Sequence, residues 1–252
     1  MQLGTAATTA MDQTLDYGVD APQVTRMFFL IGTLLLATGA ALIGFIGESW
    51  ATWLGGLLML AALAPLTLGV MMRLYAWRGK LRTRDWMLAR HDWQGIETVL
   101  DIGAGRGLLT IGAARKAPQG VVHAIDIWRA EDLTDNGEAG LRKNIAAAGL
   151  EDRVQIHTMD ARAMTFADGS IDVILSLLCL HNIKDPKDRQ AACREIARVL
   201  KPGGVAYIAD YTATRSYAAA FLEEGLKVTG PTNAIPVALS LMFLVEARKP
   251  LS

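Results

Sequence analysis

Two long uncharged segments near the start of the chain set it apart from an ordinary soluble sequence. Residues 27–46 and 51–72 are almost wholly apolar, and Glu48 is the one charged residue between Met27 and Met72. A helix needs about 20 apolar residues to cross a bilayer core. The pattern therefore predicts a hairpin of two transmembrane helices, 27–46 and 51–72. A buried helical hairpin in a soluble core is the alternative, but such helices seldom run this long without a charge.

The ends and the interface of this hairpin carry their own signals. Trp50, at the end of the polar turn, and Trp53, three residues later, fit the aromatic belt at a membrane surface. No basic segment precedes residue 27, so a cleaved signal peptide is not expected. Small residues let membrane helices approach closely, and the candidates for this contact are Ala40, Gly44, Gly55, Gly56 and Ala62.

Residues 73–94 form a basic, aromatic segment directly after the second apolar run. The basic residues outnumber Asp85 and Asp92, and they are Arg73, Arg78, Lys80, Arg82, Arg84 and Arg90. A solvated helix face would look similar, but beside a membrane helix this composition indicates a juxtamembrane linker on the cytoplasmic side. We therefore expect a multi-pass membrane protein of two helices whose later residues are cytoplasmic. Two crossings return the polar tail, residues 1–26, to the same side, and we expect little fixed structure there.

From residue 95 the pattern changes to alternating short strands and helices. Strands are predicted at 97–102, 121–127, 154–158, 171–178 and 205–210. Helices are predicted at 108–116, 138–148, 186–200 and 217–224. Residues 227 onward, with a last strand at 240–247, predict a closing hairpin. This alternation predicts a doubly wound α/β domain over 95–252 that binds its ligand beyond the carboxyl ends of the strands.

Composition narrows the classes of function. The 252 residues include 25 Lys and Arg against 25 Asp and Glu, and this zero balance argues against a nucleic-acid binder. The apolar share of 52% excludes a disordered chain. The mean hydropathy of +0.26 is positive because of residues 27–72. Two cysteines rule out a disulfide scaffold, and the histidines and cysteines show no metal-ligand spacing, so no metal site is expected.

A glycine-rich turn from Asp101 to Gly107 lies between the first strand and the first helix of this domain. The dinucleotide fingerprint G-x-G-x-x-G needs a glycine at the position of Leu108, so it is not met. The spacing is G-x-G-x-G instead, with an acid two residues before the first glycine. A carboxylate here would repel a pyrophosphate and would suit a ligand that carries an amino group and a sulfonium.

Residues 99–107 (VLDIGAGRG) resemble motif I of the class I S-adenosylmethionine-dependent methyltransferases. Further segments match this family in order, namely Asp126, the pair Asp160 and Ala161, and residues 166–172, 195–204 and 247–250. The resemblance covers about residues 95–250. It implies a Rossmann-like methyltransferase fold with S-adenosylmethionine as the cofactor.

The resemblance also implies a set of cofactor contacts at the strand ends. Asp126 would bond the ribose hydroxyls, Asp160 would accept from the adenine amino group, and Asp101 would accept from the ammonium group. For Asp126 and Asp160 a purely structural role in a turn is the alternative. The expected cofactor-binding residues are Asp101, Gly103, Ala104, Gly105, Gly107, Asp126, Ile127, Asp160, Ala161 and Leu177.

The family usually places its methyl-transfer centre after the fourth strand. His181 is a candidate general base there, and packing against the adenosine or capping the next turn fits it equally well. Asn182 is expected to orient the substrate, and Tyr211 is a second residue expected to line the pocket. We interpret Cys179 as a small core residue. The Asn-Pro-Pro-Tyr type of motif, used to methylate bases, is absent.

These features lead to one main hypothesis. We expect a membrane-anchored methyltransferase that acts on a small, hydrophobic or lipid-like acceptor, such as a phospholipid amine, a quinone-like ring or a hydrophobic thiol. The linker 73–94 would cover the cofactor site, and the acidic insert 128–137 would lie at the pocket rim. One alternative is a membrane-tethered cofactor-binding or adaptor protein without turnover. Another is a nicotinamide-dependent oxidoreductase, which Leu108 disfavours. The oligomeric state stays open.

Overall fold

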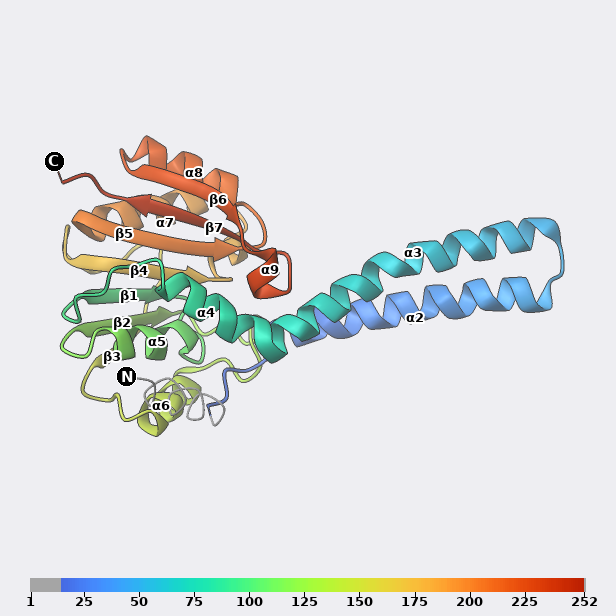
Figure 1. Cartoon of the computed structure of the whole chain (residues 1–252), viewed down its shortest axis with the longest axis horizontal. Coiled ribbons are helices and arrows are strands. Elements are labelled where there is room, and N and C mark those ends of the chain that lie inside the picture. Colours follow the sequence, from blue (N-terminus) through green and yellow to red (C-terminus); the bar gives the residue numbers. More distant parts are fainter. Residues whose placement is uncertain (1–14, 252) are drawn as a thin grey trace.

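The computed structural model describes residues 15–251, which form a seven-stranded sheet domain and a projecting helical hairpin (Figure 1). The strand order is β3-β2-β1-β4-β5-β7-β6. The first five strands run parallel, and β7 pairs antiparallel with β5 and β6. Their bounds are β1 Thr98–Ile102, β2 Val121–Asp126, β3 Val154–Thr158, β4 Ile171–Leu177, β5 Leu200–Asp210, β6 Lys227–Asn233 and β7 Phe243–Arg248. The predicted Rossmann-like α/β fold is confirmed.

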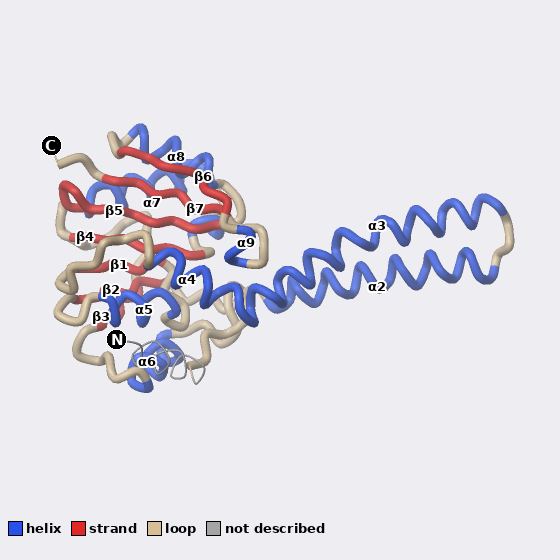
Figure 2. Tube along the Cα trace, in the orientation of Figure 1, coloured by secondary structure: helices blue, strands red, loops and turns tan. Residues whose placement is uncertain are grey.

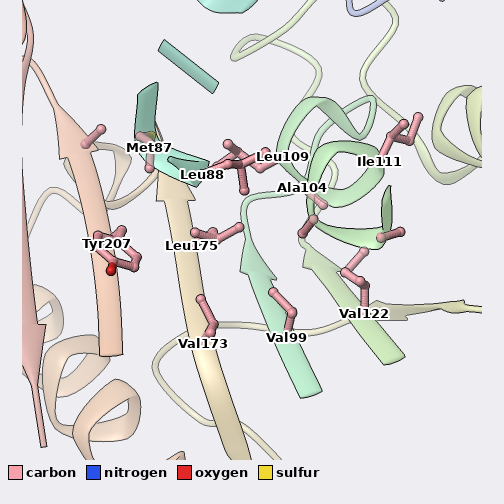
Figure 3. Packing of buried hydrophobic residues seen from close by; sticks show 14 of the residues in the cluster. Met87, Leu88, Val99, Ala104, Leu109, Ile111, Val122, Val173, Leu175 and Tyr207 are labelled. Atoms are coloured by element: carbon pink, nitrogen blue, oxygen red, sulfur yellow. The ribbon is translucent and has the colours of Figure 1, made fainter. Parts of the chain in front are cut away.

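Helices cover both faces of the sheet because successive strand residues point to opposite sides. Val99 and Val173 pack in the layer that contains Met87 of α4 and Leu109 of α5 (Figure 3). Leu100, the neighbour of Val99, packs in the other layer and is fully buried, so its truncation to alanine would cost about 2–5 kcal/mol. The covering helices are α4 Lys80–Leu88, α5 Leu108–Lys116 and α6 Glu138–Ala147 on one face, and α7 Pro186–Val199 and α8 Thr214–Glu223 on the other.

The projecting hairpin consists of α2 (Pro22–Phe45) and α3 (Ser49–Leu74), and both helices are long and apolar enough to cross a membrane. A side chain on Gly39 or on Gly55 would come within 2.6 Å of the other residue's carbonyl oxygen. The buried small residues recur one heptad apart, as in coiled-coil packing, and they are Gly32, Gly39, Gly55, Ala62 and Gly69. The prediction of Ala40, Gly44 and Gly56 at this interface is wrong, because all three are exposed.

Most of the predicted linker 73–94 is helical. The chain continues from α3 through a π-helical turn, η1 (Tyr75–Gly79), into α4. Met87 and Leu88 of α4 are buried on the sheet because they complete its apolar layer. Trp77 and Arg78 stay outside this contact, where the guanidinium of Arg78 lies 4.0 Å from the ring centroid of Trp77.

Part of the polar tail is fixed on the sheet domain. Residues 15–21, called the strap below, run along the domain just before α2. Arg106 Nη2 pairs with an Asp16 carboxylate oxygen at 2.8 Å, and Asn144 Nδ2 donates to the Asp16 carbonyl at 2.8 Å. Thr134 N donates to the Val19 carbonyl at 3.1 Å. The expectation of little fixed structure is wrong for the strap, because distant polar partners hold it; residues 1–14 of the tail lie outside the described residues.

The carboxyl ends of β1, β4 and β5 lie where the hairpin leaves the domain (Figure 1). Asp210 at the end of β5 is in register with Phe243, which follows α9 (Ile235–Ala238) and its loop. The short helix α9 packs against η1 and α4. This contact is so close that a side chain on Gly79 would overlap the Ala238 carbonyl. The ligand-binding edge of the sheet is therefore next to the base of the hairpin.

Candidate functional site

A cavity of about 480 Å³ lies at the carboxyl ends of the parallel strands. This volume is within the range of about 300–1,000 Å³ typical of small-molecule sites. Of the residues predicted to bind the cofactor or the substrate, those on its wall are Gly103, Gly105, Asp126, Ile127, Asp160, Ala161, Leu177 and Asn182. The structure therefore brings the strand-end residues together around one space.

The glycine-rich turn after β1 forms the floor of this cavity. Gly103 and Gly105 have φ angles of +76° and +52°, in the left-handed region that favours glycine. A side chain on Gly103 would overlap Cys179, whose thiol packs against the turn and lines the cavity. Cys179 therefore belongs to the cavity wall as well as to the packing that we predicted.

Gly107 does not line the cavity as predicted. It is the N-cap residue of α5, and a side chain there would come within 2.6 Å of Leu141 on α6. The third glycine of the turn therefore allows α6 to pack closely on the start of α5, which is a structural role.

Asp126 at the end of β2 holds the glycine turn in place. Its Oδ2 accepts from Gly105 N at 2.8 Å, and its Oδ1 accepts from Trp128 N at 2.7 Å. Each carboxylate oxygen can accept a second hydrogen bond. Asp126 therefore combines a structural role with unused acceptor capacity on the cavity wall, which suits a pair of ribose hydroxyls.

Asp101 lies under the turn and faces a smaller cavity of about 50 Å³, together with Ala104. Its side chain is buried, and Thr110 Oγ1 donates to Oδ2 at 2.6 Å. Burial raises the pKa of Asp101 to about 7, although the Thr110 hydroxyl partly offsets the effect. The two cavities share Gly103, Gly105 and other residues of their walls, so they adjoin. A cationic group in the smaller cavity would stabilise the charged form of Asp101.

Asp160 lies on the opposite part of the wall and is already engaged. Arg162 donates to both of its carboxylate oxygens, and Nη2 lies 2.6 Å from Oδ2. These hydrogen bonds from Arg162 lower the pKa of Asp160. Arg162 also pairs with Asp188 at 2.5 Å. These contacts with Arg162 support the purely structural role that we gave as the alternative for Asp160. The residue nevertheless borders the cavity.

Neither His181 nor Tyr211 is on the wall of the two cavities, so Tyr211 does not line the pocket as expected. Both residues contact Asp210, which was not predicted. Asp210 is completely buried at the end of β5. His181 N and Tyr217 Oη donate to Oδ2 at 3.1 and 3.2 Å, and Tyr211 N donates to Oδ1 at 2.9 Å. His181 Nδ1 lies 2.8 Å from Oδ1, in ion-pair distance but outside hydrogen-bond geometry. The His181 and Tyr211 rings meet edge to face at 4.7 Å.

Three segments that no motif singled out complete the walls. The strap contributes Asp20, and the insert contributes Leu133 and Asn136 among others. The segment after the hairpin contributes Tyr75 of η1 and Lys80 of α4 to the smaller cavity. These residues come together only through the tertiary fold. The insert 128–137 therefore forms part of the wall.

These residues fit S-adenosylmethionine. Two acceptor atoms on the wall, Asp20 Oδ2 and Asn136 Oδ1, are buried and accept no hydrogen bond from any described residue. With Asp101 and Asp126 they make the site rich in acceptors, which suits the ammonium, sulfonium and hydroxyl groups of that cofactor. Among the described residues, no cluster of three or more metal-ligating side chains occurs.

Comparisons with known proteins agree with this site. Residues 100–208 match the family model described as Methyltransferase domain. The methyltransferase GfsG of Streptomyces halstedii is 33% identical over 51% of this chain and 43% of its own length. The ubiquinone/menaquinone biosynthesis C-methyltransferase UbiE of Roseobacter denitrificans is 31% identical over 51% of this chain and 49% of its own length. The chain thus spans about half the length of these curated relatives or less.

A solved structure supports the fold. The S-adenosylmethionine-dependent methyltransferase from Aquifex aeolicus superposes with a TM-score of 0.54 over 67% of this chain and 90% of its own, at 19% identity. Together with the family match and the named relatives, this supports a methyltransferase domain around residues 100–208, with S-adenosylmethionine as its cofactor.

Proposed function

We propose that the hairpin holds this domain at a membrane surface, where it transfers a methyl group from S-adenosylmethionine to a small, hydrophobic or lipid-like acceptor. The position of the cofactor cavity carries this proposal. The cavity lies at the carboxyl ends of the strands, on the side of the domain where the hairpin leaves (Figure 1). An acceptor dissolved in the membrane therefore has a short path to the site.

The surface of the hairpin supports membrane anchoring. Leu30, Phe45 and Trp53 are 71%, 90% and 78% exposed. Burial of a large apolar side chain is worth about 1.5–3 kcal/mol, and the hairpin leaves many such side chains uncovered. A contiguous apolar surface of this kind marks a contact with a membrane or a partner. Its length and the Trp pair at its turn fit a bilayer.

The path of the chain supports one orientation. Both ends of the hairpin meet the sheet domain (Figure 2), so the strap and the catalytic domain lie on the same side of the membrane. The basic segment after α3 favours the cytoplasmic side by the positive-inside rule. The catalytic domain and the N-terminus are therefore assigned to the cytoplasm.

The relatives favour one class among the hydrophobic acceptors. UbiE is named as a C-methyltransferase of ubiquinone and menaquinone biosynthesis. A ring that carries a long hydrocarbon tail stays in a membrane while its polar head reaches a surface site. We therefore place a quinone-like ring ahead of a phospholipid amine or a hydrophobic thiol.

The chain's own residues supply positioning and proton transfer. S-adenosylmethionine supplies an activated methyl group on its sulfonium. Asp210 fixes the His181 backbone and faces its Nδ1 at 2.8 Å, so it stabilises the imidazolium that forms when His181 accepts a proton from the acceptor. Asn182 lies on the cavity wall next to His181 and orients the acceptor.

Label transfer tests the proposal. The full-length chain is incubated with methyl-labelled S-adenosylmethionine and either vesicles of a total lipid extract or a pool of water-soluble metabolites, with Asp126→Ala as the inactive control. The proposal predicts label in the organic phase of the lipid reaction. Label confined to soluble acceptors would contradict it, and cofactor binding without any transfer would indicate a non-catalytic cofactor-binding protein.

A further inference from the structure

The segments at the two ends of the hairpin meet over the smaller cavity. Asp20 belongs to the strap, just before α2 begins at Pro22, and Lys80 follows the π-helical turn after α3. Lys80 Nζ lies 2.9 Å from Asp20 Oδ2 and donates to the carbonyls of Gly18 at 2.7 Å and Tyr17 at 3.2 Å. One buried ammonium therefore joins both ends of the hairpin at the cofactor site.

The insert completes this cover through Leu133. A side chain on Gly18 of the strap or on Gly105 of the glycine turn would come within 3.0 Å of the methyl groups of Leu133. Leu133 thus packs between the strap and the glycine-rich turn. We call Asp20, Leu133, Asn136 and Lys80 the roof.

Two oxygen atoms of the roof lack donors. Asp20 borders both cavities, and its Oδ2 is buried and accepts no hydrogen bond from a described residue, because Lys80 approaches it outside hydrogen-bond geometry. Asn136 Nδ2 donates to the Arg129 carbonyl at 2.9 Å, which fixes the amide orientation. Its Oδ1 is then left without a donor, 4.0 Å from the position of a Cβ on Gly105.

A buried acceptor without a hydrogen-bond donor is unfavourable, so both atoms favour a ligand that brings donors. An ammonium group has three donors and no acceptor. It also matches the charge of Asp20, and it would stabilise the charged form of Asp101, which faces the same smaller cavity. Lys80 does not fill this role, because its ammonium donates to the carbonyls of Gly18 and Tyr17 and lies 2.9 Å from Asp20 Oδ2 outside hydrogen-bond geometry.

We infer that Asp20 and Asn136 bind the ammonium group at the amino-acid end of the cofactor, so that the segments flanking the hairpin close the cofactor site. This inference rests on the proposed function. It assigns cofactor recognition to residues outside the glycine turn and the strand ends. It also makes the base of the hairpin tighter when the cofactor is bound, because the ligand then bridges the strap and the insert.

The test compares two ligands that share the adenosine half. S-adenosylhomocysteine has the amino-acid end, and 5′-methylthioadenosine lacks it. Calorimetric titration of the full chain in detergent is done for the wild type, Asp20→Asn, Asn136→Ala and the control Asp135→Asn. Asp135 is in the same insert but its side chain is 85% exposed. We expect Asp20→Asn and Asn136→Ala to lose about 10-fold or more in affinity for S-adenosylhomocysteine, and to keep the wild-type affinity for 5′-methylthioadenosine.

Each other result counts against the inference. Equal losses for both ligands would show that the roof only supports the fold of the site. Unchanged affinity for S-adenosylhomocysteine would show that the two oxygens do not bind the ammonium group. If the wild type binds neither ligand, the proposed function fails and this inference fails with it. If the wild type binds S-adenosylhomocysteine and the variants do not show the predicted loss, only this inference fails and the proposed function stands.

Discussion

Replacing the buried Asp101 by asparagine should stabilise the protein at high pH. Burial raises the pKa of Asp101 from 3.8 to about 7, so the folded chain binds more protons than the unfolded chain between these values. Stability therefore falls as the pH rises through this window. The difference corresponds to about 4 kcal/mol above pH 7, and about 2 kcal/mol of it develops between pH 5.5 and 8.5. Asparagine removes this penalty and keeps an oxygen for the Thr110 hydroxyl.

Thermal unfolding of the ligand-free chain in detergent measures the effect. The introduced amide brings an N–H group whose burial costs about 1–3 kcal/mol at every pH, so the readout is the pH dependence of the difference between variant and wild type. At roughly 2–4 °C per kcal/mol, the variant should gain about 4–8 °C relative to the wild type between pH 5.5 and 8.5. Asp135→Asn is the charge-matched surface control. A difference that does not change with pH would refute the reasoning, because it would mean that burial does not hold Asp101 protonated.

Three further predictions address the site and the hairpin. Asp126→Ala should weaken S-adenosylhomocysteine binding in calorimetry by about 100-fold, because the glycine turn and the ligand both lose an acceptor; unchanged binding would exclude Asp126 from the site. His181→Ala should lower kcat for methyl transfer by about 100-fold and leave S-adenosylhomocysteine affinity within about twofold; equal losses in both would assign His181 to cofactor packing. Gly55→Leu should lower the melting temperature in detergent, because a side chain there would meet the Gly39 carbonyl at 2.6 Å. Gly56→Leu, which points into open space, should not, and equal effects would contradict the helix contact.

The local pattern of apolar and polar residues predicted most of the strands and helices of the sheet domain. Residues 171–178 were predicted as a buried strand from an unbroken apolar run, and the structure has β4 at Ile171–Leu177. The start of β5 at Leu200 rather than at residue 205 was missed, because Pro202 and Gly203 are typical of turns. A parallel neighbour overrides that local preference: Leu200 pairs with Ile171 across a register shift.

The parts of the site that pattern missed depend on contacts between distant segments. The sequence around Asp20 does not mark it as a residue of the cavity wall. Its position follows from the ion pair with Lys80 and from the isolated antiparallel β-bridge between Asp20 and Leu133. Asp210 had a weak signal, as an acid at the end of an apolar strand, but its partner His181 lies on another strand end. Motifs identified the residues of the turn and the strand ends. For the roof, the sequence indicated the insert and the linker as segments near the site, and tertiary structure identified their residues and Asp20.

The heptad spacing of the hairpin interface was readable in principle. Gly32 and Gly39 on α2 face Gly55, Ala62 and Gly69 on α3. We instead expected a spacing of four residues at Ala40 and Gly44, because that spacing is the best-known contact of membrane helices. The helices cross as a coiled coil does, which requires a seven-residue repeat.

Surface dilution in vesicles tests the central claim most directly. The full-length chain is reconstituted with an acceptor-bearing lipid extract, and inert phospholipid is added while the total concentrations of chain, extract and methyl-labelled S-adenosylmethionine stay constant. If the acceptor reaches the site from the membrane, the initial rate of label transfer should fall in proportion to the mole fraction of extract in the bilayer. A rate that stays constant under this dilution would show that the acceptor arrives from water and would contradict the account.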